Sequence, residues 1–189
     1  MAVIAGASGL AALVGARFED LSRDVSAVLG GPPWTGSLSQ LVGSAWFASA
    51  AIAVFAAVVL RRSGRDGARM LLTGGLLTAV MSADDLFLLH EGVFPEIGIP
   101  EVAVLGAYFV AAIVFILRFR VQLAESALLI GGALLMWVLS GVVDLVVVAG
   151  SFLLEDGAKL AGVALWSVML VRLSSAKVAA AMTDLQRIQ

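Results

Sequence analysis

The sequence predicts an all-α integral membrane protein, a bundle of about six membrane-spanning helices, and three observations carry this prediction. Of the 189 residues, 61% are hydrophobic and 14% are charged, and the mean hydropathy is +1.04. A water-soluble domain does not carry so many apolar side chains on its surface. The apolar residues form long runs, which match the roughly 20 residues that a helix needs to cross the hydrocarbon core. Strands of a membrane barrel would be shorter and would alternate in polarity, so we expect helices.

Five apolar runs define the expected spans, at residues 38–60, 70–90, 102–117, 127–149 and 152–171. A shorter run at 2–16 is the expected first span. Its competitor is a cleavable signal peptide, because the length of the apolar core suits one although a basic n-region is missing. Cleavage would leave five spans. We divide the chain into one transmembrane domain, residues 1–173, and a short amphipathic cytoplasmic tail, residues 174–189.

Lysine and arginine residues set the expected orientation, because they favour the cytoplasmic side. They gather at alternate span ends, namely Arg61, Arg62, Arg65 and Arg69, then Arg118 and Arg120, then Arg172, Lys177 and Arg187. These nine basic residues stand with three acidic ones, a net +6 inside, against a net −7 outside and −1 in residues 17–24. The formal charge of −2 conceals this polarity. We expect a multi-pass protein of the bacterial inner membrane, with both termini cytoplasmic.

Several function classes are excluded by composition and motif content. The chain has no cysteine, so it has no disulfide, thiolate metal site, iron–sulfur cluster or thiol nucleophile. No glycine-rich phosphate loop precedes a helix, so we expect no nucleotide. The positive charges are explained by topology, so we expect no nucleic acid. The expected partners are the lipid bilayer and either other membrane subunits or further copies of this chain.

Acidic residues lie within or at the ends of three expected spans, where a charge at the helix centre costs about 2.5–3.5 kcal/mol. The three segments are Ser82-Ala83-Asp84-Asp85-Leu86-Phe87-Leu88-Leu89-His90-Glu91, Ser140-Gly141-Val142-Val143-Asp144 and Leu154-Glu155-Asp156-Gly157-Ala158-Lys159. The expected topology places all three in the outer half of the bilayer. Their common depth was not used to build that topology, and it is the strongest functional signal in the chain.

Helix geometry limits how these groups can meet. Asp84 and Asp85 point about 100° apart, so both can face a shared interior only at a helix junction. Glu155 and Lys159 are four residues apart with the acid first, and their ion pair is the simplest local assignment. Asp85 and Asp144 have no basic residue within helical reach, so a positive charge must come from another segment. Lys159 alone cannot neutralise all of these acidic residues. The simplest explanation for the negative charge that is left is a bound cation or proton.

We therefore expect an outward-facing intramembrane site that binds a cation, most simply a divalent metal ion, for transport or sensing. The expected ligands are Asp85, Asp144 and Glu155, followed by His90, Asp84, Glu91 and Asp156. Lys159 is the expected charge partner that occupies the site when the ion is absent. Oxygen ligands suit calcium, magnesium or manganese, whereas one histidine with two carboxylates also suits zinc or iron.

Other interpretations stay open at this point. A metal-dependent membrane hydrolase would use His90 and Glu155 on a lipid or a peptide. An accessory subunit would use the same polar groups to bind a helix of its partner. In the plainest interpretation His90 is an interfacial residue bonded to a carboxylate, Glu155, Asp156 and Lys159 form a local ion pair, and Glu91, Glu96 and Glu101 are solvated loop residues.

Short motifs resemble known membrane proteins. Glu155-Asp156-Gly157-Ala158-Lys159 is similar to the E-E-x-x-K element of the PrsW-type and related CAAX-protease membrane hydrolases, with Asp for the second Glu. Phe87-Leu88-Leu89-His90 resembles their F-x-x-x-H with one residue missing. In those families the acidic pair comes first and further histidines complete the site, whereas here the order is reversed and His90 is the only histidine.

Two further resemblances concern the same segments. The alkaline-ceramidase-like membrane hydrolases also combine aspartate and serine, but with several histidines. The phrases D-D-L-x-L-L-H-E and L-E-D-G-x-K-L resemble those of small bacterial membrane proteins that have no assigned activity. These resemblances imply a membrane protein and leave its chemistry open.

Overall fold

The computed structural model describes residues 30–62, 67–146 and 152–186. Its contacts divide the chain into a unit of residues 1–38 and a larger unit of residues 39–189. In the first unit the described residues form a turn in which the Thr35 amide donates to the Pro32 carbonyl, and the Trp34 ring is exposed. The larger unit contains the spans and the polar residues considered below.

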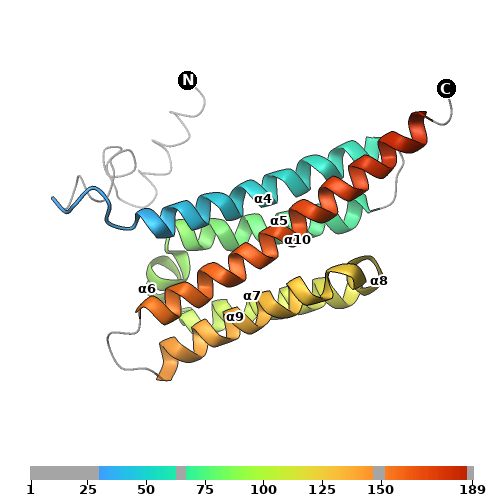
Figure 1. Ribbon diagram of the computed structural model, residues 1–189. Coiled ribbons are helices and arrows are strands. Elements are labelled where there is room, and N and C mark those ends of the chain that lie inside the picture. Colours follow the sequence, from blue (N-terminus) through green and yellow to red (C-terminus); the bar gives the residue numbers. More distant parts are fainter. Residues whose placement is uncertain (1–29, 63–66, 147–151, 187–189) are drawn as a thin grey trace. The chain divides into compact units, whose positions relative to one another are not determined.

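Every regular element in the described part of the chain is helical (Figure 1). The elements are α4 (Ser37–Arg62), α5 (Ala68–Leu86), the π-helix η1 (Leu89–Val93), α6 (Phe94–Glu96), α7 (Glu101–Arg118), α8 (Arg120–Leu123), the 3-10 helix η2 (Ala124–Ser126), α9 (Ala127–Val146) and α10 (Phe152–Gln186).

Four of the described segments are long and apolar enough to cross a membrane: Ser37–Arg62, Glu101–Arg118, Arg120–Val143 and Leu153–Asp184. The pair formed by Ala68–Leu86 and Leu89–Glu96 passes the same test, but it is bent by 64°. The five apolar runs that begin at residue 38 therefore correspond to four or five candidate spans. The predicted first span at residues 2–16, with its signal-peptide alternative, lies outside the described residues.

Exposed side chains agree with a lipid environment. Phe55 is 71% exposed, Leu128 is 93% exposed and Val110 is 61% exposed, and each lies on a long apolar helix. A soluble protein rarely leaves so much apolar surface uncovered, because that surface favours transfer out of water. The described helices are those of a membrane protein.

Three aromatic residues hold the middle of the bundle together. Trp166 on α10 is fully buried, and its ring centroid lies 5.3 Å from that of Trp137 on α9 and 6.0 Å from that of Phe115 on α7. Its indole Nε1 donates a 2.8 Å hydrogen bond to Thr78 Oγ1 on α5. A tryptophan N–H has no water partner inside a membrane, so this bond fixes the register of α5 against α10.

Small residues allow the helices to approach closely, as membrane helix packing requires. A Cβ on Gly75 of α5 would lie 3.0 Å from the Ala50 carbonyl oxygen of α4. A Cβ on Gly162 of α10 would lie 2.5 Å from Trp137 Cδ1 of α9. Figure 1 shows α9 and α10 side by side, and α5 contacts both α7 and α10. Helix α5 thus occupies a central place, with neighbours on several sides.

The last helix is longer than the expected span. Helix α10 continues without a break to Gln186, so residues 174–186 of the predicted tail extend the same helix. Residues 163–186 contain neither glycine nor proline and are rich in alanine, which favours continuation. Ser174 and Ala181 are buried, and a Cβ on Gly67 would lie 3.3 Å from Lys177 Cδ. This part of α10 packs on the bundle.

Candidate functional site

The helix that carries both aspartates ends within the predicted span of residues 70–90. Helix α5 stops at Leu86, and Leu88 adopts a left-handed backbone with φ 51°. The π-helix η1 then leads away at 64° to α5. A left-handed conformation costs a leucine of order 1–2 kcal/mol, so the surrounding structure must hold this turn in place.

This junction buries both aspartates. Asp84 is 2% exposed and Asp85 is 8% exposed, although they are neighbours in the chain. Both lie in the last turn of α5, so their side chains diverge by about 100°, and each must be covered by a different neighbour. The sequence argument required a helix junction for both to be buried, and the structure has a junction here.

Asp84 and His90 form a buried pair across the bend. His90 Nδ1 lies 2.5 Å from Asp84 Oδ2, and the two side chains are 7% and 3% exposed. Tyr108 of α7 lies beside the same carboxylate. The second oxygen, Asp84 Oδ1, accepts no hydrogen bond of ordinary geometry from the described residues. The Tyr108 hydroxyl, which can donate to this carboxylate, and a bound proton or another cation are the groups that would satisfy this buried oxygen.

The other ring nitrogen of His90 faces more exposed carboxylates. His90 Nε2 lies 3.5 Å from Glu91 Oε1 and 4.0 Å from Glu101 Oε1. The Glu91 and Glu101 side chains are 51% and 42% exposed. The imidazole therefore connects a buried carboxylate, on its Nδ1 side, with carboxylates that reach the surface, on its Nε2 side.

Asp85 has a different partner. Lys159 Nζ of α10 forms an ion pair with Asp85 Oδ1, in which the lysine side chain is 37% exposed and the aspartate side chain is 8% exposed. Glu91 and Asp156 also act electrostatically on this ammonium group. The positive charge that Asp85 needed thus comes from another helix, as its sequence context required.

The remaining predicted ligands are Glu155, Asp156 and Asp144. Glu155 is half-buried in the first turn of α10 and Asp156 is exposed, whereas Asp144 lies on α9 with its side chain outside the described part. Among the residues that the structure describes, no group of three or more histidine and acidic side chains is close enough to hold a metal ion. Because Asp84 and Asp85 diverge from one helix end, they reach different neighbours and form two adjacent pairs.

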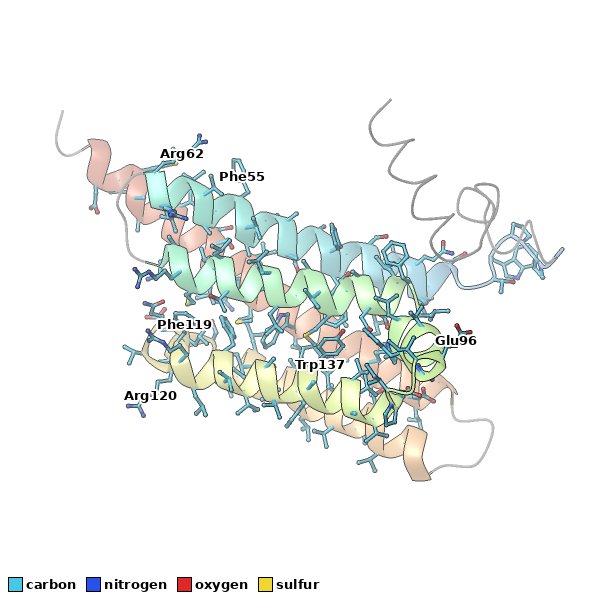
Figure 2. All side chains as sticks on the ribbon, turned by 180° about the vertical axis from the view of Figure 1, so that it is seen from behind. Phe55, Arg62, Glu96, Phe119, Arg120 and Trp137 are labelled. Carbon is cyan, nitrogen blue, oxygen red and sulfur yellow. The ribbon has the colours of Figure 1, made fainter. Side chains whose placement is uncertain are left out.

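Glu96 and two of the arginines lie at opposite ends of the bundle. Figure 2 shows Glu96 at the end that holds α6, and Arg62 and Arg120 at the other end. The Asp84 and Asp85 pairs lie near the acidic end, where α5 gives way to η1. These three residues, which the sequence analysis assigned to two membrane sides, are therefore separated in space.

Sequence reasoning missed two residues of this site. Glu101 was expected to be a solvated loop residue, but it lies at the start of α7 within 4.0 Å of His90 Nε2. Tyr108 was not singled out, although it is the only tyrosine in the chain. The two are seven residues apart, so they share one face of α7, and this spacing was the available signal.

Comparison with known proteins places the chain in a family. A family model described as "Domain of unknown function (DUF8692)" matches residues 1–173. The chain belongs to the DUF8692 family. No curated protein and no solved structure matches it. The DUF8692 match includes both ion pairs, from Asp84 to Lys159, but its description assigns no activity. The function of this DUF8692 member must therefore be argued from the site, and the hydrolase and accessory-subunit alternatives stay predictions.

Proposed function

We propose that this membrane protein binds a cation at the α5–η1 junction and transports or senses that cation. The observation that carries the proposal is the buried pair of Asp84 and His90, joined at 2.5 Å. The described geometry accommodates a proton directly, and the proton is the cation that we favour. A divalent metal ion is the alternative that the experiments below must distinguish.

The buried pair has the charge balance of a proton site. When a neutral His90 donates its Nδ1 proton to an ionised Asp84, the pair carries a net charge of −1 in a place that water barely reaches; one additional proton makes the pair neutral. Removing an ionised carboxylate from water costs several kcal/mol unless a partner compensates it. Binding of a proton therefore has a large effect on the energy of this junction.

His90 has the geometry of a proton relay. A proton taken up at Nε2 from Glu91 or Glu101 turns His90 into an imidazolium, which becomes neutral again by passing its Nδ1 proton to Asp84. The exposed carboxylates exchange protons with water. Ionisable chains of this kind inside membrane helices are typical of proton pathways.

The adjacent ion pair supplies a way to sense the change. Asp85 follows Asp84 directly and is joined to Lys159 of α10. A change in the charge of Asp84 alters the electrostatic field at Asp85, and with it the contact between α5 and α10. Lys159 keeps the role of a charge partner that a bound cation would have to displace.

A divalent ion would require a rearrangement. Its most direct position is at His90 Nε2, between Glu91 and Glu101. Zinc binds nitrogen and oxygen ligands at roughly 2.0–2.2 Å, so the two half-exposed glutamates would have to close on the ring. Both side chains have the exposure that such movement needs.

The test is proton uptake by liposomes that contain the purified protein, followed with a trapped pH-sensitive dye after a potassium diffusion potential is imposed. We expect faster internal acidification than in protein-free liposomes, its loss in His90→Ala, and its retention in Glu96→Ala, which removes an exposed acid of α6. A sensor would give no flux, but the protection of residues 84–93 from hydrogen exchange, after correction for the intrinsic pH dependence of the exchange rate, would change with pH in the wild type and not in His90→Ala. Absence of both responses would contradict the proposal.

Elemental analysis of the same samples addresses the metal alternative. A near-stoichiometric divalent ion that is lost in His90→Ala and kept in Glu96→Ala would identify the metal as the bound cation and overturn the assignment of the proton. Samples that are free of such an ion and respond to pH would support the proton.

A further inference from the structure

A second feature lies at the arginine end of the bundle. A cavity of about 900 Å³ lies between the end of α4, the start of α5, the end of α7 and α8. Four arginines line it, namely Arg61, Arg69, Arg118 and Arg120. The volume is that of a small-molecule or lipid headgroup site, which typically measures about 300–1,000 Å³. Figure 2 shows Phe119 and Arg120 of this region at the end opposite to Glu96.

The positive charge of the four arginines has no acidic partner among the residues that the structure describes. Within residues 30–62, 67–146 and 152–186, none of them forms an ion pair, and the described ion pairs all involve His90 or Lys159. Arg118 lies over the Phe119 ring at 5.5 Å, which orients its guanidinium without neutralising it. Four guanidinium groups around one cavity favour an anion, and their planar forks match the oxygens of a phosphate.

The rest of the lining is apolar and continues onto the surface that faces lipid. Val58 of α4, Leu117 of α7 and Val121 of α8 line the cavity and are 42%, 64% and 83% exposed. A free phosphate ion would gain nothing from these side chains. A molecule with a phosphate at one end and hydrocarbon chains at the other matches both parts of the lining.

We propose that this cavity binds an anionic glycerophospholipid, with its phosphate among the arginines and its acyl chains along the exposed apolar residues of α4, α7 and α8. The position suits such a lipid, because the cavity lies at the ends of candidate spans, where headgroups meet the protein. This site is separate from the Asp84–His90 pair, and it does not rest on the proposed cation function.

The test is native mass spectrometry of the detergent-solubilised protein titrated with phosphatidylglycerol, and separately with phosphatidylcholine. We expect saturable binding of the anionic lipid at low stoichiometry and at least about tenfold weaker binding of the zwitterionic one. The double variant R69Q/R118Q should weaken phosphatidylglycerol binding roughly tenfold or more. The matched control R62Q/R172Q removes equal charge from two exposed arginines that do not line the cavity, and its binding should be unchanged.

Several results of these and further measurements would contradict the proposed lipid site. Equal weakening in both double variants would show a diffuse charge effect, and equal binding of the two lipids would show simple detergent-like adsorption. Protection from thermal unfolding by inorganic phosphate alone, as strong as that by phosphatidylglycerol, would assign the cavity to a soluble anion. R118K keeps the positive charge but removes the planar guanidinium group. Weaker binding of phosphatidylglycerol by R118K would therefore support phosphate recognition by the guanidinium. Helical circular dichroism confirms folding of every variant before titration.

Discussion

Lys159 on α10 and Asp85 at the end of α5 form an ion pair in which the carboxylate is almost fully buried and the ammonium is partly exposed. This contact joins the first turns of α10 to the helix end that carries both buried aspartates. It also explains how a carboxylate with no basic neighbour in its own helix is tolerated within an apolar segment.

The ion pair predicts a strong coupling between its two residues. Lys159→Met leaves a buried carboxylate without its partner and should destabilise the protein by about 2 kcal/mol, less than for a fully buried pair because the lysine is partly exposed. The double variant Asp85→Asn, Lys159→Met should recover most of this loss. Thermal midpoints in one detergent give the comparison, with the exposed Glu96→Gln as the control. A double variant as unstable as the sum of the single variants would show that the two residues act independently.

The left-handed turn after α5 predicts an unusual stabilising substitution. Leu88→Gly should raise stability by about 1 kcal/mol, because glycine adopts φ 51° without the steric cost that leucine bears. Leu88 is 53% exposed, so little packing is lost. Leu135→Gly, on the exposed side of α9, should instead lower stability by about 1 kcal/mol, since its backbone is helical. The same sign for both variants would argue against a strained junction.

Two glycines of α10 predict opposite effects of alanine. Gly162→Ala would place a Cβ 2.5 Å from Trp137 Cδ1 and should lower the thermal midpoint by separating α9 from α10. Gly157→Ala meets no atom within 4 Å and should raise stability by up to about 1 kcal/mol through helix propensity. Detergent-solubilised samples of the two variants provide the measurement. If Gly162→Ala is as stable as Gly157→Ala, the close approach of α9 and α10 is wrong.

The helices were predictable because their signal is length and apolar composition. Residues 38–60 and 102–117 were expected as spans, and the helices Ser37–Arg62 and Glu101–Arg118 occupy these segments. The end of α5 was not predictable, because residues 87–89 are as apolar as the helix before them. A left-handed turn is usually recognised in a sequence by a glycine. Here the left-handed residue is Leu88, so this signal is missing.

The sequence indicated which residues form the site better than it indicated which of them contact one another. A buried carboxylate stands out in an apolar run, so Asp84 and Asp85 were recognised from the sequence. Their partners depend on tertiary contacts that periodicity does not encode. Lys159 was assigned first to Glu155 within its own helix, and the described ion pair reaches Asp85 on another helix. Glu101 was missed for the same reason, since an acid at the start of a helix is commonly solvated.

The ring nitrogens of His90 give the most direct test of the proposed proton site. His90 is the only histidine, so the ¹⁵N signals of its ring can come from no other residue. We predict that the wild type at neutral pH carries a proton on Nδ1, hydrogen bonded to Asp84, and that Asp84→Ala moves the ring to the Nε2–H tautomer, whereas Glu96→Ala changes nothing. A wild-type ring with an unprotonated Nδ1, or one that Asp84→Ala leaves unchanged, would contradict the Asp84–His90 proton pair and the function built on it.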